Sequence, residues 1–134
     1  MNYWLVKTEP DSYSWNDLVK DKKTVWDGVR NFQARSHMKK MEKGDTVFIY
    51  HTGEEKAIIG QAHVTKSAYP DPKDTEWVVV ELAPQKQLKK TVSLAQIKSD
   101  KRLTDMVLVR ASRLSVQPVK SVEYDLIIGL SEAK

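Results

Sequence analysis

Cysteine is absent from this chain of 134 residues. Its absence excludes disulfide bonds, thiolate nucleophiles and zinc sites built on cysteine, and it fits a reducing compartment. No apolar run approaches the ~18 residues that a membrane-spanning helix requires. The first residues also lack the basic and apolar blocks of a secretory signal peptide. We therefore expect a cytoplasmic protein without membrane contact, folded as a single domain over residues 1–134.

Glycine and histidine are scarce too, and their positions exclude several kinds of site. The 5 glycines are scattered, so the chain has neither a Walker loop nor a dinucleotide-binding fingerprint. Its 3 histidines, His37, His51 and His63, show no metal-ligand spacing, so we expect no metal and no other cofactor. A GxSxG elbow is missing. A hydrolase that uses His51 and Glu9 stays open as an alternative, although no nucleophile is identifiable beside them.

The charge balance is mildly basic, with 22 lysines and arginines against 18 aspartates and glutamates. The resulting formal net charge of +4 favours a nucleic-acid partner, because cationic side chains release counterions from phosphates. A well-solvated surface explains the same balance without any partner. We expect DNA or RNA as the partner and a monomeric chain.

Hydrophobic patterning alternates short strands with short helices. Runs of β-branched and aromatic residues predict strands at residues 3–6, 24–26, 46–51, 57–65, 76–82, 91–92 and 113–119. Apolar residues at helical spacing predict helices at residues 15–19, 31–40, 94–98, 103–109 and 122–130. This order predicts an α+β fold, either a small curved β-barrel with short helices on its outside or an α+β sandwich.

Serines mark the expected beginnings of three helices. Ser14 precedes the first helix, with Asp17 three residues later, which is a form of capping box. Ser93 and Ser121 precede two later helices in the same way. These positions predict where the chain turns from extended to helical backbone.

Other residues refine the strands and the core. Pro84 is expected to end the strand at residues 76–82, and residues 69–72 are expected to form a loop, because proline cannot donate a ladder hydrogen bond. Gly60 inside a strand indicates a bulge or a close backbone approach. Trp4 and Trp77 lie in apolar runs, so we expect both in the core.

The turn that follows the strand at residues 24–26 holds the most telling aromatic residue. Trp26 is flanked by polar and flexible residues, in the order Trp-Asp-Gly-Val-Arg-Asn. An indole in this setting offers a stacking face for a nucleobase, and the amide of Asn31 suits the edge of a base. Two other roles stay open: Trp26 as a plug at one end of the fold, and Asn31 as a helix cap.

Basic residues follow this turn directly. We expect Arg30 and Arg113 to flank the mouth of a pocket and to bind phosphates. Arg35, Lys39 and Lys40 lie on the helix after the turn and are expected to extend the same phosphate-binding surface. The alternative is an ordinary solvated helix face.

Several motifs together resemble the EVE domain family. They are YWLVKTEP at residues 3–10, WDGVRN at residues 26–31 and RLSVQPV at residues 113–119, in that order over nearly the whole chain. The resemblance implies a PUA-like fold, which is also that of the YTH domain. It further implies a non-catalytic domain that binds a modified base, chiefly a modified cytosine such as 5-methylcytosine in DNA, or a modified base in RNA, by flipping it into a pocket.

The resemblance also implies which residues line that pocket. The flipped base is expected in a slot between Trp26 and the strand end at Tyr50 and His51. The first strand end and the late loop are expected to supply the other lining residues. The full set of expected pocket residues is Lys7, Thr8, Glu9, Trp26, Val29, Asn31, Tyr50, His51, Ser112, Leu114 and Ser115. A binder of small metabolites that uses the same slot is a further alternative.

Overall fold

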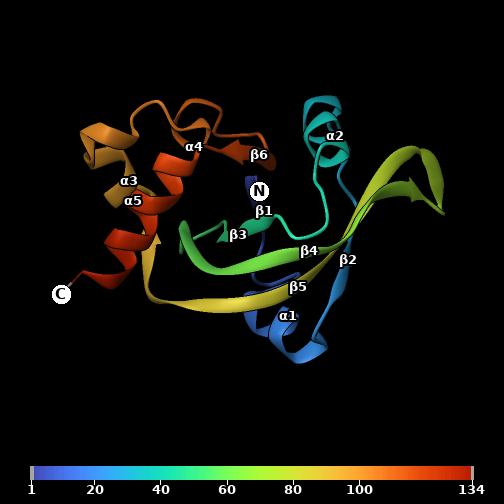
Figure 1. Cartoon of the computed structure of the whole chain (residues 1–134), viewed down its shortest axis with the longest axis horizontal. Helices are drawn as coiled ribbons and strands as arrows, with labels where there is room; N and C mark the ends of the chain where they lie inside the picture. Colours follow the sequence, from blue (N-terminus) through green and yellow to red (C-terminus); the bar gives the residue numbers. More distant parts are fainter. Residues whose placement is uncertain (1, 134) are drawn as a thin grey trace.

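The computed structural model describes residues 2–133, and Figure 1 shows its helices around one curved sheet. The strands are β1 (Tyr3–Thr8), β2 (Thr24–Trp26), β3 (Thr46–His51), β4 (Ala57–Asp71), β5 (Asp74–Ser93) and β6 (Val116–Val119). The helices are α1 (Trp15–Asp21), α2 (Phe32–Lys39), α3 (Leu94–Ser99), the short 3-10 helix η1 (Lys101–Leu103), α4 (Val107–Arg110) and α5 (Ser121–Glu132). Within the described part of the chain, no helix is both long and apolar enough to span a membrane.

The six strands form one mixed sheet in the order β2-β5-β4-β3-β1-β6. β1 pairs in parallel with β3, and the other neighbouring strands are antiparallel. The predicted α+β class and the curved sheet with outer helices are confirmed. The sheet curves but does not close into the expected barrel, because its edge strands β2 and β6 do not pair with each other.

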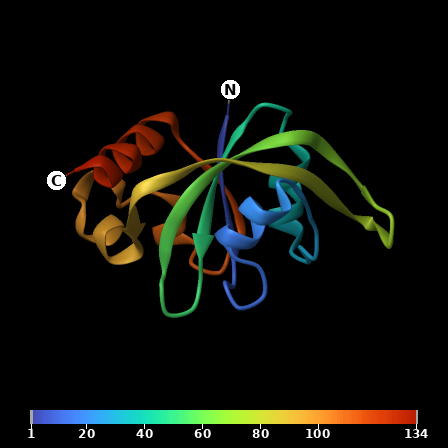
Figure 2. The same ribbon diagram turned by 90° about the horizontal axis from the view of Figure 1, so that it is seen from below.

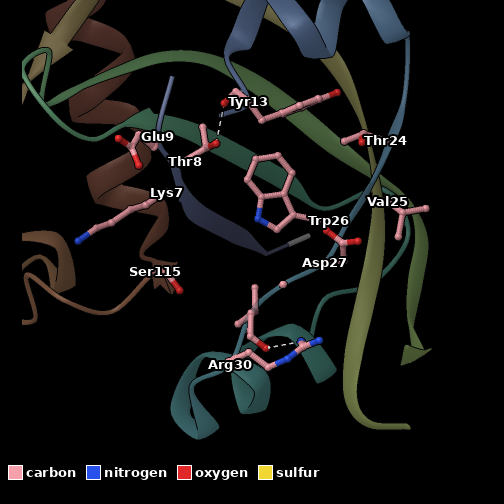
Figure 3. A pocket seen from close by; sticks show the side chains of 12 residues that line it. Lys7, Thr8, Glu9, Tyr13, Thr24, Val25, Trp26, Asp27, Arg30 and Ser115 are labelled. Atoms are coloured by element: carbon pink, nitrogen blue, oxygen red, sulfur yellow. Dashed lines mark hydrogen bonds between the residues drawn. The ribbon is translucent and has the colours of Figure 1, made fainter. Parts of the chain in front are cut away.

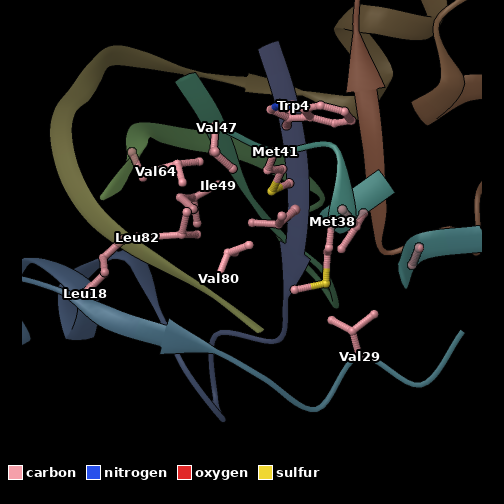
Figure 4. Close-up of a cluster of buried hydrophobic side chains, with 14 of the residues drawn as sticks. Trp4, Leu18, Val29, Met38, Met41, Val47, Ile49, Val64, Val80 and Leu82 are labelled. Carbon is pink, nitrogen blue, oxygen red and sulfur yellow. The ribbon is translucent and has the colours of Figure 1, made fainter. Parts of the chain in front are cut away.

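The central strands are buried on both faces of the sheet. Successive side chains point to opposite faces of a strand, so each strand contributes to both apolar clusters. In β1, Trp4 and Val6 pack into one apolar cluster and Leu5 into the other. In β3, Val47 and Phe48 divide in the same way. Helices α1 and α2 cover the first cluster, part of which Figure 4 shows, and α3, α4 and α5 cover the second. The continuous apolar runs of β1 and β3 follow from this two-sided burial.

The longest strands, β4 and β5, form a hairpin that extends beyond the rest of the sheet (Figure 2). Two sequence predictions were wrong here. β4 continues to Asp71 through the expected loop at residues 69–72, and β5 continues to Ser93 through Pro84. The register of the pair shifts at Gln61/Ala62, where Ala62 faces Pro84. Such an irregularity accommodates a residue without an N–H group.

Helix beginnings follow the sequence in two of the three expected cases. Ser14 and Asp17 form the capping box of α1, and Ser93 forms one with Gln96 at α3. The third expectation was wrong: Ser121 lies inside α5, whose cap position is Lys120. The Lys120 N–H donates to the Glu123 carboxylate at 2.9 Å, so the acidic side chain satisfies the helix start from within its first turn.

Two of the residues singled out in the sequence have their expected surroundings. Trp4 is buried, and its indole N–H donates to Asp45 Oδ2 at 3.0 Å. Gly60 lies at a register shift and also directly against the ring of Trp15. The expectation for Trp77 was wrong, because this side chain is only half-buried and stacks on the exposed Phe32.

Candidate functional site

A cavity of about 380 Å³ opens where the end of β1 meets β2 and the turn that follows it (Figure 3). Its volume is within the range of small-molecule sites in proteins. The lining residues come from four segments of the chain: Lys7, Thr8, Glu9, Tyr13, Thr24, Val25, Trp26, Asp27, Gly28, Val29, Arg30 and Ser115. We call it the Trp26 cavity, because this indole projects into its centre (Figure 3).

Trp26 is half-buried at the end of β2, where it pairs with Val80 of β5. The ring of Tyr13 meets it edge-on, with centroids 6.1 Å apart and an interplanar angle of 83°. The indole N–H has no hydrogen-bond partner among residues 2–133. Trp26 thus presents both an aromatic surface and a free donor to the cavity.

The turn after Trp26 is fixed by its backbone and by one buried side chain. Gly28 has φ +76, a left-handed conformation that glycine adopts without steric cost. Val29 is buried in the first apolar cluster, beside Met38 (Figure 4). Arg30 then points outward, and its Nη2 lies 3.5 Å from Asp71 Oδ2. The buried side chain of Val29 anchors this turn and so holds both Trp26 and Arg30 at the cavity.

The end of β1 supplies the polar wall. Thr8 Oγ1 donates to the Tyr13 carbonyl at 2.6 Å, and Lys7 Nζ donates to the Ser112 carbonyl. Burial lowers the pKa of Lys7. The carboxylate of Glu9 is exposed and has no partner among the described residues. Glu9 is therefore free to accept hydrogen bonds from a bound molecule.

Six of the expected pocket residues lie at the Trp26 cavity, and five do not. Tyr50 is buried and lines a neighbouring pocket, where Lys7 Nζ lies 5.8 Å from its ring centroid. Trp26 and the strand end at Tyr50 and His51 therefore do not line a common slot, contrary to the expectation. Ser112 lines that neighbouring pocket, and Leu114 packs in the core.

His51 has a structural position instead. Its Nε2 accepts from the Trp15 backbone N–H at 3.0 Å, so Nδ1 carries the proton and donates to Glu55 Oε1 at 2.8 Å. Both ring nitrogens are engaged, and the imidazole ties the start of α1 to β3. The structure does not bring His51 together with Glu9 at the cavity, so the hydrolase alternative has no geometric support.

Asn31 and Arg113 belong to a separate pocket of about 280 Å³. The Asn31 side-chain oxygen accepts from the Ala34 N–H at 2.9 Å, so the side chain caps α2. This contact is the helix cap that the sequence left open as the other role of Asn31, and the residue does not line the Trp26 cavity. The exposed Lys39 lies further along α2, and Lys40 lines another pocket beside Trp4.

Several residues at the cavity were not predicted. Thr24 and Val25 precede Trp26 on the same short strand, and this adjacency was a signal that the sequence offered. Tyr13 is brought in by the loop after β1, which no spacing in the sequence indicates. Among the described residues, no cluster of acidic and histidine side chains has the arrangement of a metal site.

Comparison with known proteins gives one consistent result. A model of the EVE domain family matches residues 2–130. Thymocyte nuclear protein 1 from Homo sapiens is 33% identical over 167 residues, which cover 98% of this chain and 74% of that protein. This agreement along nearly the whole chain supports the family that the sequence motifs predicted.

Solved structures agree with the family match. Rpa0253 from Rhodopseudomonas palustris is 44% identical, with a TM-score of 0.94 over 98% of this chain and 93% of that one. Human THYN1, solved in complex with 5-methylcytosine-containing DNA, is 30% identical, with a TM-score of 0.92 over 100% and 99%. These likenesses confirm the PUA-like fold. By sequence and by structure, this chain belongs to the EVE domain family.

Proposed function

We propose that this chain is a non-catalytic DNA-binding domain that takes a flipped, modified cytosine into the Trp26 cavity. The proposal draws on the human relative, which has been solved with 5-methylcytosine-containing DNA. Its main support in this chain is the half-buried indole of Trp26, which faces a cavity of about 380 Å³. Stacking of a base on an aromatic side chain contributes ~1–3 kcal/mol.

The polar wall of the cavity favours cytosine over thymine or uracil. Cytosine carries an amino group at the position where the other two pyrimidines carry an oxygen, and carboxylates accept hydrogen bonds from this amino group. The carboxylate of Glu9, which lines the cavity and has no partner among residues 2–133, would accept this hydrogen bond. An oxygen at the same position would face a negative charge. The free indole N–H of Trp26 supplies a donor beside this acceptor.

Flipping a base out of a duplex costs a few kcal/mol, so single-stranded DNA should bind more tightly than duplex. One buried methyl group contributes ~0.8 kcal/mol. The preference for 5-methylcytosine over cytosine is therefore expected to be modest, about tenfold or less. Phosphate contacts come from cations at the cavity mouth, of which Arg30 is the nearest in the sequence to Trp26.

The test is a titration of labelled single strands that differ only in one 5-methylcytosine, followed by fluorescence anisotropy. The methylated strand should bind more tightly. Trp26→Ala should abolish most of the affinity, whereas Trp26→Phe, which keeps a flat ring, should retain part of it. Thermal unfolding of both variants serves as the control, since Trp26 is only half-buried and its loss should leave the fold intact.

Three outcomes would contradict parts of this proposal. Equal affinity for the methylated and unmethylated strands would show that the chain does not recognise the modification. Unchanged affinity in Trp26→Ala would show that the base does not bind in the Trp26 cavity. Tighter binding to an RNA strand of the same sequence would replace DNA by RNA, with the same cavity.

A further inference from the structure

A second aromatic cluster lies outside the Trp26 cavity, at the junction of α2 and the β4–β5 hairpin. Phe32 and Trp77 stack with ring centroids 5.2 Å apart and an interplanar angle of 23°. The guanidinium of Arg35 lies 4.8 Å from the Phe32 centroid and 5.2 Å from that of Trp77, and the guanidinium of Arg30 lies 5.4 Å from Trp77. We call these four side chains the aromatic–arginine platform.

The platform is held in place although it is open to solvent. Arg35 Nη1 donates to the Glu76 carbonyl at 2.7 Å, which ties α2 to β5. Arg30 is anchored by its contact with Asp71 on β4. Even so, Phe32 remains 62% exposed. Phe32 therefore offers an aromatic surface that the residues packed against it leave uncovered.

Charge points to the kind of occupant. Two guanidinium groups flank the stacked rings, and arginine pairs readily with phosphate oxygens. Arg30 has a carboxylate partner, whereas Arg35 has none within ion-pair distance among residues 2–133. Flat rings beside a cationic group that lacks a carboxylate partner are a combination that suits single-stranded nucleic acid, where bases stack and phosphates are neutralised.

The platform is also continuous with the Trp26 cavity. Arg30 lines the cavity and lies over Trp77 as well. A strand whose base occupies the cavity therefore reaches the platform across a single side chain. The segment from Trp26 to Phe32 thus carries both an inner aromatic ring, facing the cavity, and an outer one, facing solvent.

We propose that the aromatic–arginine platform binds the nucleotide next to the one whose base enters the Trp26 cavity. The neighbouring base stacks on Phe32, and Arg35 neutralises its phosphate. This inference rests on the proposed function, because it needs a strand anchored in the cavity. It adds a second base-binding position, which sets the minimal ligand at a dinucleotide rather than a single base.

The test is a double-mutant cycle between Phe32 and the neighbouring base. The probes are short single strands with one 5-methylcytosine and either normal bases on both sides or an abasic residue on its 5′ or its 3′ side. Wild type should lose roughly five- to a hundredfold in affinity for one of the two abasic probes. Phe32→Ala should lose a similar factor for the normal probe and nothing further for that abasic probe.

Further substitutions of Phe32 test whether a flat ring is required, and a substitution at another exposed apolar residue serves as the control. Phe32→Trp should keep the affinity, whereas Phe32→Leu, which keeps apolar area without a flat ring, should lose it. Val122→Ala removes another exposed apolar side chain, 59% exposed on α5, and should change nothing. Equal losses on all probes in Phe32→Ala, or no loss at all, would overturn the platform.

The same titrations separate the two proposals. If binding depends on Trp26 but not on Phe32, the platform is wrong and the cavity stands. If wild type binds none of the strands, or binds them equally well as Trp26→Ala, the proposed function fails and the platform fails with it.

Discussion

At the residue scale, the packing of α1 on β4 depends on one close approach between a glycine and an indole. A Cβ atom built on Gly60 would lie 2.7 Å from two ring atoms of Trp15. Trp15 is only 2% exposed and lies within the first apolar cluster, so its ring can move only by displacing its neighbours. Trp15 also begins α1, the helix that follows the cavity loop with Tyr13. Side-chain size at this position is therefore set by packing.

Gly60→Ala is expected to destabilise the fold by ~1–3 kcal/mol, the usual cost of overpacking. Gly129→Ala is the matched control, since nothing lies within 4 Å of a Cβ at this position of α5. Alanine in a helix is favoured over glycine by ~0.5–1 kcal/mol, so this variant should be more stable than wild type. Urea unfolding measures both. Equal effects of the two substitutions would show that Trp15 does not limit position 60.

The tryptophans show how far single residues are predictable. The position of Trp26 at a cavity was predictable, because polar and flexible neighbours rarely surround a core indole. Trp77 was not, since its apolar neighbours Val78, Val79 and Val80 are buried while the residue itself lies where the hairpin leaves the body of the sheet. Sequence patterns report the average surroundings of a run. They do not report where a strand extends beyond the strands that pair with it.

At the element scale, the hairpin of β4 and β5 shows the same limit. Proline predicts a strand end from its own geometry alone, yet β5 continues through Pro84. Register shifts in the pair with β4 absorb the missing N–H, including one beside Ala62. Irregularities of this kind belong to two strands at once, so neither strand's sequence predicts them. The expected Asn31 cap could be read from one segment alone, and it is present.

The joint between α3 and η1 provides a pH-dependent test at this scale. Asp100 accepts from the Arg102 backbone N–H and Nε at 2.9 and 3.0 Å, and from Nη2 at 2.7 Å. These hydrogen bonds to Arg102 lower the pKa of Asp100 from 3.8 to about 2. A carboxylate with a depressed pKa in the folded state stabilises the fold while it is ionised.

Asp100→Asn should therefore be less stable than wild type near neutral pH, by a small margin because the site is at the surface. The difference is expected in full above the ordinary pKa of 3.8 and should vanish as the pH falls through about 2. Urea midpoints of both proteins across this range measure it. Arg102→Gln should show a similar loss. A difference that stayed constant with pH would mean that the charge of Asp100 contributes nothing.

At the scale of the whole molecule, the net charge of +4 does not say where a strand would run, whereas the spacing of charges along α2 gives one path that can be tested. Phe32, Arg35 and Lys39 are spaced i, i+3 and i+7 along α2, so they share one helix face. Lys40 lies off this face, beside Trp4. A strand that leaves the aromatic–arginine platform along α2 would pass Lys39, at about 1.5 Å of rise per residue, and would miss Lys40.

Lys39→Gln and Lys40→Gln form a matched pair, because each removes one positive charge from neighbouring positions of the same segment. For a long single strand, Lys39→Gln should reduce the slope of log affinity against log salt by about 0.7, the value for one phosphate contact. Lys40→Gln should leave the slope unchanged, which departs from the initial expectation that both lysines bind phosphate.

A dinucleotide should not distinguish the two variants, since Lys39 lies about 10 Å from Phe32 along the helix axis, roughly three stacked nucleotides away. Equal losses of slope in both variants would mean that the protein attracts the strand through its overall charge, without a path along α2.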